Sequence, residues 1–174
     1  MNQSELNQII IEHGKWLEDS STGSRASLRG VDLRGLKLSN VDLSGADLSY
    51  VDLRSAELSF TDFRGTNFRG ADLRSLKLSN VDLSGADLSV TDLRNVDFRD
   101  ADLRGVNFRG ADLRNVDFRG ADLRNADLSK ADLRGADFRN AKLSFTDFRS
   151  SNLSKADFRD TDLSKADLRG VTLR

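Results

Sequence analysis

The chain has 174 residues, and its 27 Lys or Arg residues nearly balance its 28 Asp or Glu residues, which argues against a strongly basic nucleic-acid binder and against an acidic solvating tail. Cysteine is absent, which excludes disulfides, thiolate metal sites and a cysteine nucleophile. No apolar run approaches the length of a membrane span, and Met1–Glu5 lacks the basic start of a signal peptide, so we expect no membrane contact and a cytoplasmic protein.

The first 25 residues predict one helix, from about Ser4 to Glu18. Asn2 or Ser4 is expected to cap its start, and Glu5 stands three residues after Asn2, as in a capping box. The polar run 20–24 ends the helix. We expect this helix to cover the open end of the array that follows, where backbone groups would otherwise be unpaired. Its covering face consists of residues spaced three and four apart, Leu6, Ile9, Ile10, His13, Trp16 and Leu17.

From Ala26 to Arg174 the chain repeats a five-residue unit without insertion or deletion. The centre of each unit, position i, is always Leu or Phe, from residue 28 to residue 173 in steps of five. Position i−2 is small or apolar, i−1 is mostly Asp, and i+1 is always Arg or Ser. Two inward positions around one outward position are typical of a short strand, and the next two residues predict a turn. A strict short period predicts a solenoid of stacked units.

The units resemble the A(D/N)LXX motif of the pentapeptide-repeat family. Examples are Ala-Asp-Leu-Ser-Lys at 126–130, Ala-Asp-Leu-Arg-Gly at 131–135 and Ala-Asp-Phe-Arg-Asn at 136–140. The resemblance implies an all-β solenoid, a right-handed quadrilateral β-helix with four units per coil and with i and i−2 facing inward. The expected organisation is a capping helix and linker over 1–25, followed by about seven and a half coils over 26–174.

If a coil holds four units, residues twenty apart should stack, and the order of Leu and Phe supports this independently of the resemblance. Phenylalanines gather in columns, and where two fall in one coil they stand on opposite walls, which suits a core of fixed width. We therefore expect the structural core to include Leu28, Leu48, Phe68, Leu88, Phe98, Phe108, Phe118, Phe138, Phe148 and Phe158.

Outward charges also form columns, for example Asp32 and Asp52 beside Arg34 and Arg54. We expect each arginine to pair with its adjacent aspartate, which disfavours direct nucleic-acid binding. Some pentapeptide-repeat proteins mimic DNA and bind topoisomerases such as DNA gyrase, and that activity needs a strongly acidic rod. The leader holds two of the basic and four of the acidic residues, which leaves 25 basic and 24 acidic residues in the repeats. A protein-interaction or DNA-mimic module acting on a topoisomerase is therefore the alternative function.

The first-choice function is a structural scaffold without catalysis. His13, the only histidine, lies on the apolar face of the predicted helix and is expected to pack within the cap. No loop concentrates metal ligands and no phosphate-binding or nucleophile motif occurs, so we expect no metal, no cofactor and no catalytic residue. The uniformity of the units favours a consensus or designed sequence, which would then exist only as a recombinant protein.

The chain stops at Arg174, halfway through its eighth coil, with no segment after it. Terminal repeats without a polar cap expose apolar side chains and unpaired backbone, which promotes self-association. We expect a weak end-to-end homodimer through the last coil, because the cross-section of the rod is small. The residues at this contact would be Phe158, Leu163, Leu168 and Leu173.

Overall fold

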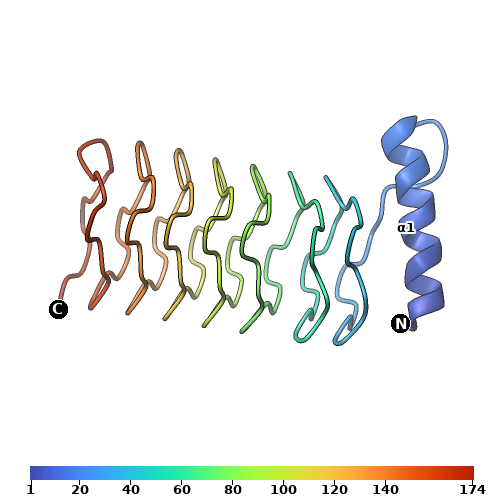
Figure 1. The fold of residues 1–174 in the computed structure, drawn as a ribbon, viewed down its shortest axis with the longest axis horizontal. Coiled ribbons are helices and arrows are strands. Elements are labelled where there is room, and N and C mark those ends of the chain that lie inside the picture. Colours follow the sequence, from blue (N-terminus) through green and yellow to red (C-terminus); the bar gives the residue numbers. More distant parts are fainter.

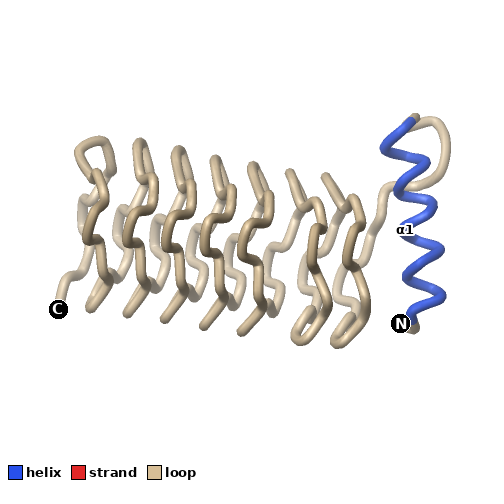
Figure 2. Tube along the Cα trace, in the orientation of Figure 1, coloured by secondary structure: helices blue, strands red, loops and turns tan.

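The computed structural model describes residues 1–174 without a gap. It contains one helix, α1 (Gln3–Glu18), which lies across one end of a row of stacked coils (Figure 1). The N-terminus is at this end, and the C-terminus lies at the far end of the row. From residue 26 onward the chain alternates turns with single-residue parallel bridges, so Figure 2 shows no strand.

The register of the coils is constant. Every bridge joins two residues twenty apart in the sequence, beginning with Ser27 and Asp47. The Leu28 N–H donates to the Asp47 carbonyl (2.7 Å), and the Asp47 N–H donates to the Ala26 carbonyl (3.0 Å). Because this pair of bonds recurs along the array, each coil contains four pentapeptides. The register predicted from the columns of Leu and Phe is therefore confirmed.

Each unit ends in a turn that places position i+2 in the left-handed region. Gly30 and Asn40 have φ angles of 68° and 60°. Glycine adopts this conformation freely, and asparagine tolerates it better than other residues do. The turn also binds the next coil, since the Gly30 N–H donates to the Ser49 carbonyl (2.8 Å). The composition of position i+2 therefore reflects backbone conformation as well as surface exposure.

Val90 is the least suitable residue at this position, because it is β-branched and its φ is 51°. We expect Val90→Asn to raise the free energy of unfolding by about 1 kcal/mol. The reverse change at Asn95, whose φ is 60°, should lower it by a similar amount. Urea denaturation of the two variants measures both effects, and two unchanged midpoints would contradict the account of the turn.

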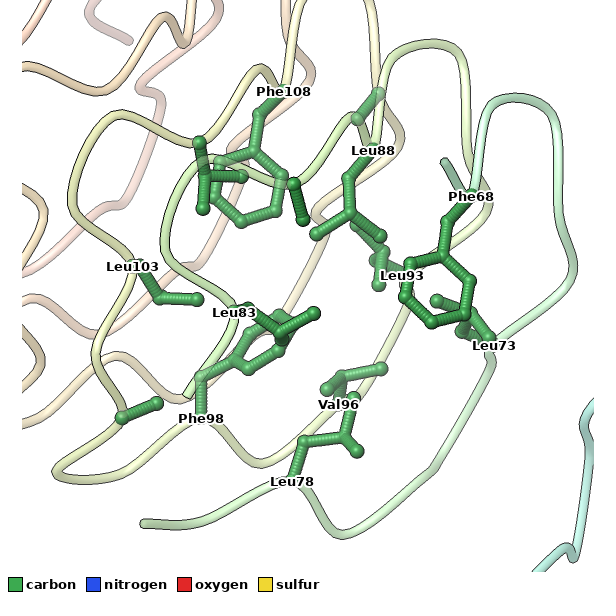
Figure 3. Close-up of a cluster of buried hydrophobic side chains, with 14 of the residues drawn as sticks. Phe68, Leu73, Leu78, Leu83, Leu88, Leu93, Val96, Phe98, Leu103 and Phe108 are labelled. Carbon is green, nitrogen blue, oxygen red and sulfur yellow. The ribbon is translucent and has the colours of Figure 1, made fainter. Parts of the chain in front are cut away.

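The core is a single column of side chains from positions i and i−2, part of which is shown in Figure 3. Parallel phenylalanine rings stack along one wall, with centroids 5.6 Å apart for Phe98 and Phe118 and 5.0 Å apart for Phe118 and Phe138. Phe108 meets Phe118 edge-on from the opposite wall at 6.0 Å. The expected core residues Leu28, Leu48, Phe68, Leu88, Phe98, Phe108, Phe118, Phe138 and Phe148 are at most 2% exposed.

Phe158 differs from the other expected core residues, because it is only half-buried. Its ring stacks on Phe138 at 4.7 Å, so one face of the ring is covered. No residue twenty positions further along exists in this chain to cover the other face. The burial of a repeat residue thus depends on its level in the rod as well as on its place in the unit.

Of the two residues expected to cap the start of α1, Asn2 and Ser4, the structure has Asn2. Asn2 is the N-cap, its side chain accepts from the Glu5 N–H (2.9 Å), and the Glu5 carboxylate accepts from the Asn2 N–H (2.9 Å). Leu6 and His13 are fully buried against the first coil. The other residues expected on this face, Ile9, Ile10, Trp16 and Leu17, are half-buried.

Two polar side chains of α1 take the place of a preceding coil. The Gln3 amide accepts from the Lys37 N–H (2.9 Å) and donates to the Lys37 carbonyl (3.0 Å). The Nδ1 atom of His13 accepts from the Ala26 N–H (3.1 Å). These bonds satisfy backbone groups that would otherwise be orphaned at the edge of the first coil. The cap is therefore held by directional bonds as well as by apolar contact.

Candidate interaction surface

The outward surface of half of the units is an aspartate–arginine pair on one short segment. In the first such pair, Arg34 donates from Nε to Oδ1 of Asp32 (2.9 Å) and from Nη2 to Oδ2 (2.6 Å). The Arg34 N–H also donates to Oδ1 of Asp32, closing the turn (3.1 Å). Arg54 and Asp52 repeat this geometry one coil later. The bidentate pairing suits the planar guanidinium and fixes both side chains flat on the face.

Arginines also reach the aspartate of the next coil. The Nε atom of Arg54 lies 3.3 Å from Oδ2 of Asp72, and that of Arg74 lies 3.5 Å from Oδ2 of Asp92. Each face of this type is a ladder of aspartates beside a ladder of arginines, so repulsion between stacked like charges is offset locally. The expected self-compensation of the surface is present in these ion pairs.

The paired arginines lower the pKa of the aspartates. Hydrogen bonds from the Arg134 side chain hold the pKa of Asp132 below its ordinary value, although partial burial acts in the opposite direction. Hydrogen bonds from Arg159 and Arg169 lower the pKa values of Asp157 and Asp167 to about 2. These groups are open to solvent, so each pair alone adds little stability.

The lowered pKa values predict loss of stability in acid. The folded state binds protons more weakly than the unfolded chain. The stabilisation of the folded state by the ion-paired aspartates is therefore present above the ordinary aspartate pKa of 3.8 and is lost as the pH falls toward 2. We expect the thermal midpoint to fall steeply between these pH values. Circular dichroism melts measure it, and high salt should flatten the change. A constant midpoint down to pH 2 would contradict a contribution from the ladders.

Units without the aspartate–arginine pair occur on other faces too, for example at Lys37 and Asp42, but on one face they follow one another over six coils. We call it the Arg29 face, and it comprises the outward residues of the units centred on residues 28, 48, 68, 88, 108 and 128. Three of its coils have arginine at i+1 but Ser or Asn at i−1, and no carboxylate lies within 4.0 Å of Arg29, Arg69 or Arg109. The coils between them have Ser at i+1 and an aspartate without an arginine partner at i−1, namely Asp47, Asp87 and Asp127.

The Arg29 face is also regular in its backbone. Its ladder of bridges runs without a break from Ser27 to Asp167. Asp47 accepts from the Asn67 side chain of the next coil at 3.1 Å, and this bond is repeated two coils later. The Arg29 guanidinium lies 4.8 Å from the centroid of the Tyr50 ring, a cation–π contact. The face is therefore rigid but carries charges of both signs without ion-pair partners.

On two other faces the ladder of backbone bridges is interrupted once, and we call each interruption an opening. No bridge joins Glu57 to Lys77 or Lys142 to Asp162. The first opening is a groove of about 360 Å³ beside Phe60, whose side chain is 89% exposed. Phe145 lies at the second opening, 5.2 Å from the ammonium of Lys165. The uniform unit of the sequence by itself gives no sign of these openings.

The groove beside Phe60 does not combine groups for catalysis. Its ionisable lining residues are Lys77 and Asp82, and the rest of the lining consists of Ser, Thr, Asn and apolar side chains. His13 lies in the capping helix and does not line this groove, and burial lowers its pKa. No cluster of three His, Cys, Asp or Glu side chains in the structure is placed to hold a metal ion.

The four residues expected at a carboxyl-terminal contact form a gradient of exposure. Phe158 and Leu163 are half-buried, Leu168 is 37% exposed and Leu173 is 69% exposed. The Leu143–Leu163 level lacks its bridge, so the last coil is joined to the array less completely than the others. The structure thus brings these side chains together at one end of the rod.

Comparison with known families identifies the repeats. The family model for pentapeptide repeats matches the chain in eight copies, and the matched stretches together span residues 26–174. The chain belongs to the pentapeptide-repeat family. Its leader, residues 1–25, lies outside the matched stretches. Membership accounts for the five-residue unit and its inward Leu or Phe, and no enzyme family is indicated.

Several solved pentapeptide-repeat structures are similar to this chain. HetL from the cyanobacterium Nostoc sp. strain PCC 7120 is 28% identical, with 91% of this chain and 95% of HetL covered and a TM-score of 0.43. QnrB1, a plasmid-mediated fluoroquinolone resistance protein, is 22% identical, with 86% and 94% covered and a TM-score of 0.48. A pentapeptide-repeat protein of the Arabidopsis thaliana thylakoid lumen is 38% identical, with 58% and 70% covered and a TM-score of 0.33. Curated proteins gave no match.

The helix α1 is the chain's only helix, and the structure holds none with the length and apolar character that a membrane crossing requires.

Proposed function

We propose that this pentapeptide-repeat protein is a non-catalytic scaffold, a right-handed quadrilateral β-helix in consensus-like or designed form. The observation that carries this proposal is the repeated bidentate pairing of aspartate and arginine on the faces of the rod, as between Asp32 and Arg34. Such pairs use their charges internally and leave little of that charge for a ligand. The uniform unit, with only Leu or Phe at its centre, supports a consensus or designed origin.

The alternative is a DNA mimic that acts on a topoisomerase. A mimic must present an uncompensated negative field comparable to that of the phosphates. Here an aspartate such as Asp132 is engaged by Arg134 at 2.6 Å, and the whole chain carries a formal net charge of only −1. The charge arrangement therefore favours the scaffold over the mimic.

A supercoiling assay with DNA gyrase separates the two functions. The scaffold proposal expects undiminished supercoiling at micromolar concentrations of the protein. Inhibition at sub-micromolar concentration would overturn it and support the mimic. The matched control is a variant with Arg134 and Arg114 changed to Gln, which removes both arginines near Asp132 and the bidentate partner of Asp112 without changing the core. If charge pairing is what prevents mimicry, inhibition should appear first in this variant.

A second activity, end-to-end pairing of this chain, is supported by the exposure of Leu168 and Leu173. Apolar side chains and backbone edges at the end of a solenoid favour contact with a second molecule. The small cross-section makes such contact weak. Light scattering over a concentration series should show a dimer that weakens in the variant Leu168→Asp, Leu173→Asp. A monomer at every concentration would refute end-to-end pairing.

A further inference from the structure

The Arg29 face alternates from coil to coil in all three of its outward positions. Coils with a long arginine at i+1 have glycine at i+2, and coils with a short serine at i+1 have a bulky residue at i+2. The i+1 column reads Arg29, Ser49, Arg69, Ser89, Arg109, Ser129. The i+2 column reads Gly30, Tyr50, Gly70, Val90, Gly110, Lys130. The pattern repeats every forty residues, which is two coils.

The charges alternate in the same way. An arginine without an acidic partner occupies one coil, and an aspartate without a basic partner occupies the next. Neighbouring coils are about 4.8 Å apart, so the free arginines are about 9.6 Å apart and the free aspartates have the same spacing. On the adjacent face that begins with Arg34, by contrast, each coil from Arg34 to Arg134 carries its own aspartate and its own arginine.

We propose that the Arg29 face pairs with the same face of a second copy of this chain, side by side and antiparallel. The two-fold axis lies in the interface, perpendicular to the rods, between the coil of Arg69 and the coil of Ser89. This axis preserves the columns and reverses the order of the six coils. Every arginine then faces a serine: Arg69 faces Ser89 of the second copy, and Arg29 and Arg109 face its Ser129 and Ser49.

This pairing supplies each free aspartate with an arginine. Within one chain, an arginine at i+1 pairs with the aspartate at i−1 of the same unit, as Arg34 does with Asp32. Arg69 of one copy would occupy the i+1 place beside Asp87 of the second copy, where the chain itself has only Ser89. The two half-filled ladders would interdigitate into a complete aspartate ladder beside a complete arginine ladder. That is the arrangement which each molecule already has along its Arg34 face.

The i−1 column fits the same axis. In this column, Asp87 faces Asn67, an amide that can donate to a carboxylate. An acceptor thus opposes a donor in this column.

A second copy fits this face better than other occupants do. Three free arginines alone would suit an acidic polymer, but an aspartate lies between successive arginines and would repel it. Parallel pairing of two copies would place Arg29 opposite Ser27 and Asp47 opposite Ser49, leaving the charges unmatched. Only an antiparallel copy has charges of both signs at the required spacing. Because the six coils span about 29 Å and the face is narrow, the contact is smaller than a standard interface, and association is weak.

Two single variants of the full 174-residue chain test the pairing. In Arg69→Asp, an aspartate lies beside Asp87 of the second copy, and in Asp87→Arg, two arginines lie beside each other. Each variant alone should associate more weakly than the unchanged chain, whereas an equimolar mixture restores complementary charges and should associate as the unchanged chain does. Sedimentation velocity up to about 1 mM protein measures this weak association. The unchanged chain should associate about tenfold more weakly in about 1 M NaCl, where the Debye length is about 3 Å.

The control is Arg74→Asp, which makes the same charge change in the same coil on the neighbouring face. It should associate normally. If Asp87→Arg fails to fold, the pair Arg29→Asp and Asp127→Arg repeats the test at the ends of the interface. A monomeric unchanged chain at the highest concentration, or self-association of Arg69→Asp equal to that of the unchanged chain, overturns the proposal. Association that is lost only in Leu168→Asp, Leu173→Asp also overturns it, and leaves end-to-end pairing in its place.

Discussion

Phe118→Ala should lower the free energy of unfolding by about 3–5 kcal/mol. Phe118 is fully buried at the middle of the stacked column, with Phe98 at 5.6 Å on one side and Phe138 at 5.0 Å on the other. Its removal opens a cavity between two coils that cannot approach each other, because bridges on all four faces fix their separation. Urea denaturation followed by circular dichroism measures the loss.

Two matched variants show whether the loss comes from the cavity. Phe118→Leu keeps a centre residue that other units use, and it should cost less than about 1.5 kcal/mol. Phe158→Ala removes the same ring from the end of the stack, where it is half-buried, and should cost about 1–2 kcal/mol. Equal losses for Phe118→Ala and Phe158→Ala would contradict the dependence on level within the rod.

The register and the core of the repeats could be predicted from the sequence because the period is strict. With a centre every five residues and no insertion, one choice of units per coil fixes which side chains stack. The alternating Leu and Phe columns, such as Phe98 above Phe118, supplied that choice. The aspartate–arginine ladders followed, since i−1 and i+1 lie on the same face. The capping box of α1 was readable because its two residues are local in sequence.

The contacts of the cap could not be predicted. The bonds from Gln3 to Lys37 and from His13 to Ala26 join residues 34 and 13 positions apart, and no periodic pattern encodes them. Gln3 lay outside the apolar stripe that was used to orient the helix. The unit pattern describes how one coil meets another, and it contains no information about how a helix meets the first coil.

The openings in the ladder were missed for a different reason. They depend on small differences in how successive coils stack, which a uniform unit conceals. One signal was nevertheless present: the run Leu-Ser-Phe-Thr-Asp-Phe-Arg occurs at 58–64 and again at 143–149, and an opening follows each run. In both runs the buried threonine at i−2 of the next unit donates to a carbonyl 23 residues earlier, as Thr61 does to Leu38 at 2.7 Å.

The residues that carry the unpaired charges of the Arg29 face can be seen in the sequence, but the near equality of basic and acidic residues over the whole chain conceals that they are unpaired. Composition counts an arginine and an aspartate as neutralising each other wherever they stand. The structure separates Arg69 from Asp87 by one coil, so their charges sum to zero although neither has an oppositely charged partner within 4.0 Å. Balance over the chain therefore does not imply local pairing, and the difference lies in the i−1 residue of each unit.

The second large effect is expected at the cap, from Gly23→Ala. Gly23 has a φ of 62°, and a Cβ atom added there would lie 2.2 Å from the Glu12 carbonyl oxygen and 2.7 Å from the Lys15 Cβ. The carbonyl belongs to α1 and cannot turn away, and it already accepts from the Ser24 N–H at 3.0 Å. The linker or the helix must therefore move. Left-handed strain and overpacking together should cost about 2–4 kcal/mol.

The cost should appear as detachment of α1 before the rod unfolds, because each repeat contacts only its neighbours and the cap contacts only the first coils. Hydrogen exchange locates it: the Lys37 and Ala26 amides, which Gln3 and His13 accept from, should lose protection, while amides in the middle of the rod keep theirs. Gly35→Ala is the matched control, since Gly35 has a φ of 68° but no atom within 4 Å of an added Cβ. It should cost about 1 kcal/mol and leave the Lys37 and Ala26 amides protected. Equal exchange in the two variants would show that strain in the turn, and not the collision with α1, controls the docking of the cap.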